Sequence, residues 1–107
     1  MITITVFRSA AGVYKGFVCE GHAGYANRGK DIVCASVSTL VINTINSIEA
    51  FCHQAFDCAE EKDSIRLELT ASPTKETTLL LDSMVFGLQA IEQEYQERYL
   101  KVECREV

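Results

Sequence analysis

Apolar and polar residues alternate at the beginning of the chain, as they do along a β-strand with one buried face. Threonines separate Ile2, Ile4 and Val6, and a second extended segment follows at residues 13–20 after a turn at residues 9–12. Neighbouring strands that are joined by a short turn usually pair antiparallel. We therefore expect the chain to begin with a β-hairpin.

Two longer segments have the spacing of helices instead. Asp31 can cap the first helix, which we expect to end near His53. Its apolar positions recur every three or four residues, at Val33, Val37, Leu40, Val41, Ile45, Ile48 and Cys52. For the second helix, Ser72 is the expected N-cap and Pro73 lies in the first turn. The apolar stripe of this helix consists of Leu81, Met84, Val85, Leu88, Ile91 and Tyr95, so both helices can bury one face.

The remaining segments complete a small mixed fold. Residues 57–63 suit a short acidic connection or an edge strand, residues 65–69 alternate like a strand, and residues 100–104 form a last strand. The element order is β-β-α-β(-β)-α-β. This order predicts an α+β fold in which two helices pack on a mainly antiparallel or mixed sheet of about four to five strands. We expect residues 1–107 to form a single domain.

Charge and cysteine content narrow the class of protein. The net charge is −5, and the ten Lys and Arg are scattered without a basic stripe, so we do not expect direct nucleic-acid binding. The first residues lack the pattern of a signal peptide, and Ser, Thr and Asn interrupt the uncharged run at residues 32–48, which argues against a membrane span. Five cysteines are an odd number in a chain without an export signal. We therefore expect thiols and a cytoplasmic location.

The glycine-containing segment GHAGYANRGKDIVC lies between the expected second strand and first helix. Residues 24–30 satisfy G-x-x-x-x-G-K, the pattern of a phosphate-binding loop, in the strand-to-helix context that such a loop needs. The next residue is Asp31, where this loop requires Ser or Thr to hold Mg²⁺. A carboxylate at that place would repel the phosphates. We therefore do not expect nucleotide binding.

A reactive thiol explains the same segment better. If Asp31 caps the helix, Cys34 lies in the first turn, where the backbone N–H groups and the helix dipole stabilise a thiolate. The intervening loop is long enough to bring His22 to the sulfur. Cys34 could then attack a carbonyl while His22 moves the proton, and N–H groups at the helix start could hold the oxyanion. Asp31 could also orient His22, and Ser38 lies one turn beyond Cys34 on the same side.

Two other interpretations of these residues remain open. A single cysteine in line with Val41 and Ile45 is often a small buried hydrophobic residue, and a loop histidine often only contacts backbone. The chain also carries two groups of residues that zinc accepts as ligands. One group is Cys19 and His22, and the other is Cys52, His53 and Cys58. Their spacing is poor for a zinc site, because paired C-x-x-C segments are absent from the sequence.

The residues around the thiol resemble a known family. Gly21-His22-Ala23, followed after a short loop by Asp-Ile-Val-Cys-Ala-Ser-Val-Ser at residues 31–38, closely resembles the ribosomal-processing cysteine protease family, Prp, of Firmicutes and related bacteria. The likeness extends over essentially the whole chain, although the later strands and the second helix are generic. Ser36 stands where the family pattern has a second alanine.

This resemblance implies a cysteine endopeptidase that removes a short N-terminal extension from the bacterial large-subunit ribosomal protein twenty-seven. Cleavage would follow a Phe-Phe pair and would be needed for ribosome assembly. His22 and Cys34 match the family's catalytic histidine and cysteine, and Gly21, Asp31 and Ser38 match supporting or substrate-binding positions. The resemblance further implies a homodimer with a mobile loop before the cysteine and no metal or other cofactor. The alternative is a non-catalytic, ribosome-associated module that binds peptides in the same groove.

Overall fold

The computed structural model describes residues 1–27 and 31–107. Its elements are β1 (Ile2–Arg8), β2 (Tyr14–Gly21), α1 (Ile32–Phe51), β3 (Phe56–Glu61), β4 (Ser64–Leu69), α2 (Lys75–Glu94) and β5 (Leu100–Glu106). The expected element order is confirmed, and the acidic segment forms an edge strand. Arg28, Gly29 and Lys30 lie outside the described residues. They belong to the G-x-x-x-x-G-K pattern and to the loop that is expected to be mobile.

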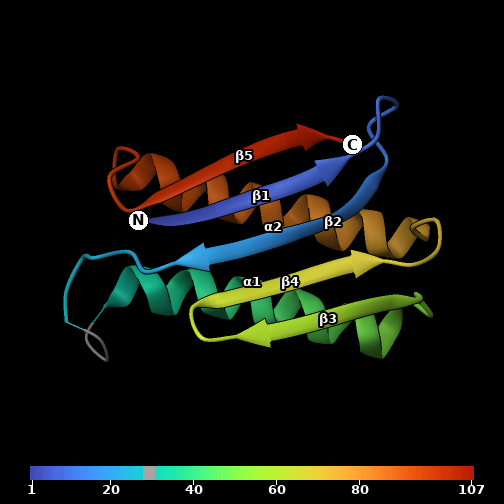
Figure 1. The fold of residues 1–107 in the computed structure, drawn as a ribbon, viewed down its shortest axis with the longest axis horizontal. Helices are drawn as coiled ribbons and strands as arrows, with labels where there is room; N and C mark the ends of the chain where they lie inside the picture. Colours follow the sequence, from blue (N-terminus) through green and yellow to red (C-terminus); the bar gives the residue numbers. More distant parts are fainter. Residues whose placement is uncertain (28–30) are drawn as a thin grey trace.

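The strands form one mixed sheet of five strands in the order β3-β4-β2-β1-β5. β1 pairs antiparallel with β2, so that Ile4 lies opposite Cys19, and it pairs in parallel with β5, where Ile4 lies opposite Val102. β4 pairs antiparallel with both β2 and β3. Both helices lie on one side of this sheet (Figure 1). The predicted α+β fold with two helices on a mixed sheet is therefore confirmed.

The hydrophobic core lies between the sheet and the two helices. Ile2, Ile4 and Val6 of β1 point into it, as their alternation with threonines predicts. The apolar stripes of the helices supply most of the other side, namely Val33, Val37, Val41, Ile45, Ile48, Leu81, Met84 and Leu88. One contiguous cluster thus joins β1 to both helices, so the start of α1 is fixed relative to the ends of β1 and β2.

By length and composition, α1 would be able to cross a bilayer, because its most apolar window has a mean hydropathy of 1.4. Counting its Ser, Thr and Asn residues is therefore not enough to argue against a span. The apolar character has another explanation in the structure: Val33, Val37, Val41, Ile45 and Ile48 are buried in the core against the sheet and α2.

The start of α2 differs from the prediction. The N-cap is Thr74, whose side chain accepts a hydrogen bond from the Thr77 N–H at 3.1 Å, so the assignment of Ser72 as N-cap was wrong. Pro73 precedes the cap and does not lie in the first turn. The cause is a long-range contact, since the Thr74 N–H donates to Oε1 of Gln54 at 2.9 Å. That bond fixes the extended backbone before Thr74 and delays the helix by two residues.

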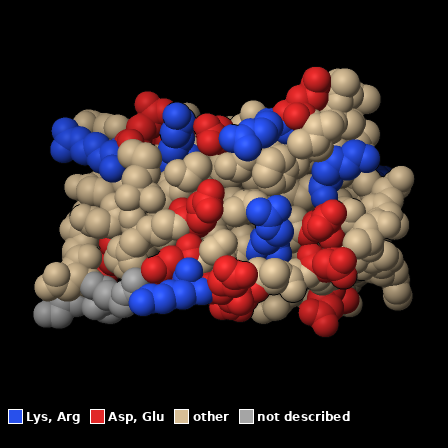
Figure 2. Space-filling view, viewed as in Figure 1, with Lys and Arg blue, Asp and Glu red and all other residues tan. Residues whose placement is uncertain are grey.

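The other face of the sheet carries side chains of both charges. Arg66 and Glu68 on β4 alternate with the buried Leu67, and Lys101 and Glu103 occupy the same face of β5. Figure 2 shows that Lys and Arg are interspersed with Asp and Glu over this surface. The view shows no continuous basic stripe on this face among the described residues. This distribution matches the expectation from the sequence for the face in view.

Candidate active site

Gly21 ends β2 and directs the chain toward the start of α1. Its φ is +98°, and a Cβ atom at this position would collide with the Met1 carbonyl oxygen. Only glycine combines this backbone conformation with so close an approach. The Gly21 N–H also donates to the Asp63 carbonyl at 2.9 Å, which ties the end of β2 to the turn between β3 and β4. Gly21 therefore determines the position from which the next residue, His22, projects.

Asp31 caps α1, as the sequence predicts, and also binds the loop. Its Oδ1 accepts hydrogen bonds from the backbone N–H groups of Val33 at 3.0 Å and Cys34 at 2.9 Å. Its Oδ2 accepts from the Tyr25 N–H at 3.1 Å. The side chain is only 1% exposed. One buried carboxylate thus joins the first turn of α1 to the segment that follows His22.

Asp31 is held in its ionised form by these contacts. Burial of the side chain raises its pKa, but hydrogen bonds from the backbone N–H groups of Cys34, Tyr25, Ala26 and Val33 outweigh that effect. The net result is a pKa below the ordinary value of 3.8. A negative charge therefore stays at the positive end of α1, where the helix dipole also favours it.

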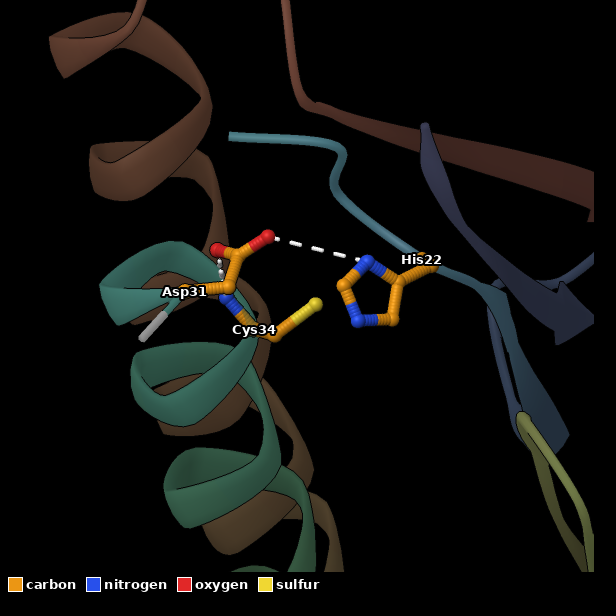
Figure 3. Close-up of side chains that lie close together, drawn as sticks. All are labelled: His22, Asp31 and Cys34. Atoms are coloured by element: carbon orange, nitrogen blue, oxygen red, sulfur yellow. Dashed lines mark hydrogen bonds and ion pairs between the residues drawn. The ribbon is translucent and has the colours of Figure 1, made fainter. Parts of the chain in front are cut away.

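His22 lies beside this carboxylate. Its Nδ1 is 3.6 Å from Oδ2 of Asp31, and the side chain is 30% exposed (Figure 3). The same Nδ1 is 3.4 Å from the Gly24 backbone nitrogen. A neutral ring with its proton on Nε2 can accept the Gly24 N–H, whereas a protonated ring can direct its Nδ1–H toward Asp31. Both protonation states of His22 thus have a partner at Nδ1.

Cys34 completes the group from the first turn of α1. Its Sγ accepts a hydrogen bond from the backbone N–H of Ala23 at 3.2 Å. His22, Asp31 and Cys34 each place a side-chain ligand atom within 4.8 Å of the others. Figure 3 shows the three side chains converging, two from the helix start and one from the segment after β2. The structure therefore brings together the cysteine and the histidine that were predicted from the sequence, together with Asp31.

A cavity of about 410 Å³ opens at these side chains, between α1 and the β3–β4 hairpin. Ser38 lies in its wall one turn beyond Cys34, and Gly21 lies at the end of β2. The apolar part of the lining consists of Ile2, Ala35, Val37, Ile42 and Ile65. The hairpin adds Glu60, Glu61, Asp63 and Ser64. All five candidate residues from the sequence thus line a single cavity, whose apolar lining comes from α1, β1 and β4 and whose carboxylates beyond Asp31 come from the hairpin.

A second thiol faces the same cavity. Burial, and after it the neighbouring Cys34 and Glu20, raise the pKa of Cys19 to about 11. Cys19 is therefore a neutral thiol at neutral pH. Of the other cysteines, Cys52 is buried, whereas Cys58 and Cys104 are exposed. Cys34 differs from all four by its place at a helix start beside His22.

The three converging side chains are also close enough together to share a metal ion. However, both oxygens of Asp31 already accept backbone N–H groups, which suits a capping and orienting role better than a ligand. The two zinc groups considered from the sequence do not form such a cluster in the part of the chain that the structure describes. These groups are Cys19 with His22, and Cys52 and His53 together with Cys58.

Three of the N–H groups at the helix start, which we expected to be able to hold an oxyanion, have partners within the protein. The N–H groups of Val33 and Cys34 donate to the Asp31 side chain, and that of Ala35 donates to the Asp31 carbonyl at 3.1 Å. An oxyanion at the helix start would compete with the Asp31 oxygens for these three groups. Two contributions from the loop were not predicted from the sequence: the N–H of Ala23 donates to the sulfur of Cys34, and the N–H of Tyr25 donates to Asp31. Backbone donors have no sequence signature, so nothing in the residue types pointed to them.

Comparison with known proteins places the chain in a family. The model of the family "Cysteine protease Prp" matches residues 1–101. Proteins named ribosomal processing cysteine protease Prp from Staphylococcus aureus and Bacillus subtilis are each 29% identical, over 91% of this chain and 93% and 92% of their own length.

Solved structures agree with this match. The crystal structure of an essential ribosomal processing protease Prp from S. aureus with a covalently linked product peptide has a TM-score of 0.92 at 26% identity, and covers 98% of this chain and 100% of its own. A second structure from S. aureus, with a substrate peptide, has a TM-score of 0.86 at 25% identity and the same coverage. The sequence match over nearly the whole chain and the shared fold agree: the chain belongs to the cysteine protease Prp family.

Proposed function

We propose that residues 1–107 form one cysteine endopeptidase domain in which Cys34 is the nucleophile and His22 the general acid and base. The observation that carries this proposal is the convergence of Cys34, His22 and Asp31 at the mouth of a cavity. A thiol at a helix start, next to an imidazole that a buried carboxylate faces, is the arrangement that activates a cysteine for attack on a carbonyl. The family to which the chain belongs acts by this class of chemistry.

In the proposed reaction, His22 takes the proton of Cys34, and the thiolate attacks the carbonyl carbon of the scissile peptide bond. The protonated His22 then gives its proton to the leaving amine, which departs and leaves a thioester on Cys34. Water, from which His22 removes a proton, hydrolyses this thioester and restores the thiol. Asp31 faces Nδ1 and therefore stabilises the protonated ring, while Gly21 positions His22. The Ala23 N–H stabilises the thiolate before attack.

For the substrate, we propose the N-terminal extension of the large-subunit ribosomal protein twenty-seven, cut after a Phe-Phe pair. The S. aureus relatives hold a substrate peptide and a product peptide, and relatives in two bacteria are named ribosomal processing proteases. The apolar wall of the cavity, which includes Ile42 and Ile65, offers surface for aromatic side chains. Ser38 also lines the cavity, which supports the proposal that it contacts the peptide.

The setting that we propose is the cytoplasm, where ribosomes are assembled, and the proposed enzyme needs neither a metal nor another cofactor. Its partner is the ribosomal protein, so that direct nucleic-acid binding and membrane association are not part of the function. We further propose a homodimer. On α2, Leu79 and Phe86 are 67% and 78% exposed and lie about two turns apart on one helix face, and in this proposal a second copy of the chain covers them.

The test is mass spectrometry of a peptide that contains the extension, after incubation with the wild-type protein, Cys34→Ala and His22→Ala. Cys58→Ala serves as the matched control, since Cys58 is exposed on β3. We expect one cut after Phe-Phe with wild type and with the control, and no cut with the other two variants. Peptide that binds wild type without being cut would favour the alternative, a non-catalytic peptide-binding module. Cleavage by Cys34→Ala would overturn the assignment of the nucleophile.

A further inference from the structure

Near the candidate active site, Tyr25 meets two tyrosines from a distant part of the chain, Tyr95 and Tyr99. The ring centroids of Tyr25 and Tyr99 are 5.2 Å apart, and Tyr95 is 5.7 Å from each of the other two. The interplanar angle is 83° for Tyr25 and Tyr99 and 73° for each of the two pairs that contain Tyr95, so every pair is arranged edge to face. This is the geometry that aromatic rings prefer, and such pairs stabilise a fold beyond the effect of the area that they bury.

Two of the rings belong to a well-fixed part of the fold. Tyr95 is the C-cap of α2, and both Tyr95 and Tyr99 pack against the hydrophobic core. The turn between them is closed by a hydrogen bond from the Arg98 N–H to the Tyr95 carbonyl at 3.1 Å. The Tyr99 carbonyl accepts from the N–H of Ile2 in β1 at 2.9 Å. Tyr95 and Tyr99 therefore form a rigid platform between α2 and β5.

The third ring belongs to the segment that carries His22. Tyr25 lies three residues after His22, and its backbone N–H donates to Oδ2 of Asp31 at 3.1 Å. The same Oδ2 is the atom that faces Nδ1 of His22. Ala23, between these residues, is buried in the core and donates to the sulfur of Cys34. The position of the Tyr25 backbone thus affects both the carboxylate and the loop that supports the histidine and the sulfur.

We propose that Tyr25 is a positioning residue, which anchors the segment after His22 to the Tyr95–Tyr99 platform and so holds the Asp31 carboxylate toward His22. Tyr25 is 42% exposed, so its role lies in this anchor and not in filling the core. Without the ring, the Tyr25 N–H leaves Oδ2, and the carboxylate turns away from the imidazole. The protonated His22 then loses its partner, and the thiolate of Cys34 becomes less stable. This inference rests on the proposed role of Cys34 as the nucleophile.

The test compares the pH dependence of Cys34 alkylation by iodoacetamide, followed by mass spectrometry of the Cys34 peptide. The variants are Tyr25→Ala, Tyr25→Phe, Tyr95→Ala and the double variant Tyr25→Ala/Tyr95→Ala. Phe51→Ala is the control, because this 73% exposed aromatic residue lies at the opposite end of α1. Circular dichroism verifies that each variant folds. The pair Tyr25→Ala and Tyr25→Phe decides the matter if Tyr95→Ala does not fold.

For Tyr25→Ala, we expect Cys34 alkylation at pH 6 to slow about tenfold and its pH midpoint to rise, since two ring contacts are lost. Tyr25→Phe should behave as wild type, because edge-to-face packing does not need the hydroxyl group. The double variant should be no slower than the slower single variant, since each removes the same anchor. The proposal is overturned if Tyr25→Ala alkylates like wild type, if Tyr25→Phe is as slow as Tyr25→Ala, or if the two effects multiply.

The alkylation experiment stays informative if the proposed peptide is not cleaved, because it measures the thiol itself. Failure of wild type to cut the peptide would count against the proposed substrate, while a slower Cys34 in Tyr25→Ala would still support the anchor. If the peptide is cleaved, Tyr25→Ala should lower kcat about tenfold with KM little changed, since proton transfer and not peptide contact is impaired. A change confined to KM would place Tyr25 in peptide binding and overturn the positioning role.

Discussion

The backbone N–H of Ala23 donates to Sγ of Cys34 at 3.2 Å, across the loop that separates the histidine from the helix. A thiolate accepts such a bond more strongly than a thiol, because the acceptor is then charged. The bond comes from the residue next to His22, so the same backbone positions the imidazole and stabilises the sulfur. The preference for the ionised sulfur can be measured directly.

Cys34 should be alkylated by iodoacetamide at pH 6 about tenfold faster than any of the other four cysteines. Cys19 should be among the slowest although it faces the same cavity, because its pKa of about 11 keeps it protonated. Mass spectrometry of the labelled peptides over time gives the order. Cys19 also shows whether iodoacetamide can enter the cavity. If it can, labelling of Cys19 should rise, but only at strongly alkaline pH, where this thiol ionises. Equal labelling of all five thiols at pH 6 would contradict the proposed activation.

Asp31→Asn should reduce stability in a pH-dependent way. The folded protein lowers the pKa of Asp31, so the charged form contributes stability that is fully present above about pH 4 and is lost as the pH falls through the folded value. At pH 6 we expect the variant to be about 1 kcal/mol less stable in urea unfolding, since Asn still caps the helix but carries no charge. This difference should shrink as the pH falls below 4. A difference that stays constant from pH 6 to pH 3 would show that the charge does not matter.

The start of α2 offers a matched pair of variants. Thr74→Ala removes the cap of the Thr77 N–H and should destabilise the protein by about 1 kcal/mol. Ser72→Ala, two residues earlier and outside the helix, should change the unfolding free energy by less than about 0.5 kcal/mol. Denaturant unfolding of both variants provides the measurement. The reverse order would restore Ser72 as the functional cap.

Phe86→Glu should convert the proposed homodimer to a monomer, because it places a charge on an exposed apolar helix face. Light scattering at micromolar concentration measures the mass. Phe51→Glu, on α1, is the control and should leave the mass unchanged. A wild-type protein that is already monomeric under these conditions would contradict the dimer.

The sequence predicted the parts of the fold and site that depend on residue type and spacing. Helical periodicity located both helices, and the position of Cys34 three residues after a capping Asp31 predicted a thiol at a helix start. Besides the backbone donors of the loop, the unpredicted features came from contacts between distant parts of the chain. Gln54 determines where α2 begins, and Tyr95 and Tyr99 receive the ring of Tyr25. Such partners lie tens of residues apart, and their residue types are common in any helix or turn, so periodicity does not reveal them.

β1 pairs in parallel with β5 along its whole length, from Ile2 beside Leu100 to Arg8 beside Glu106. Nearly the entire chain separates these two strands, so closing this pair requires a large loss of chain entropy and slows folding. During translation β1 cannot obtain this neighbour until β5 has emerged. Ile2 lies in this pair and also lines the cavity beside Cys34. The edge of β1 that carries Ile2 therefore stays without this neighbour in any intermediate in which β5 has not docked.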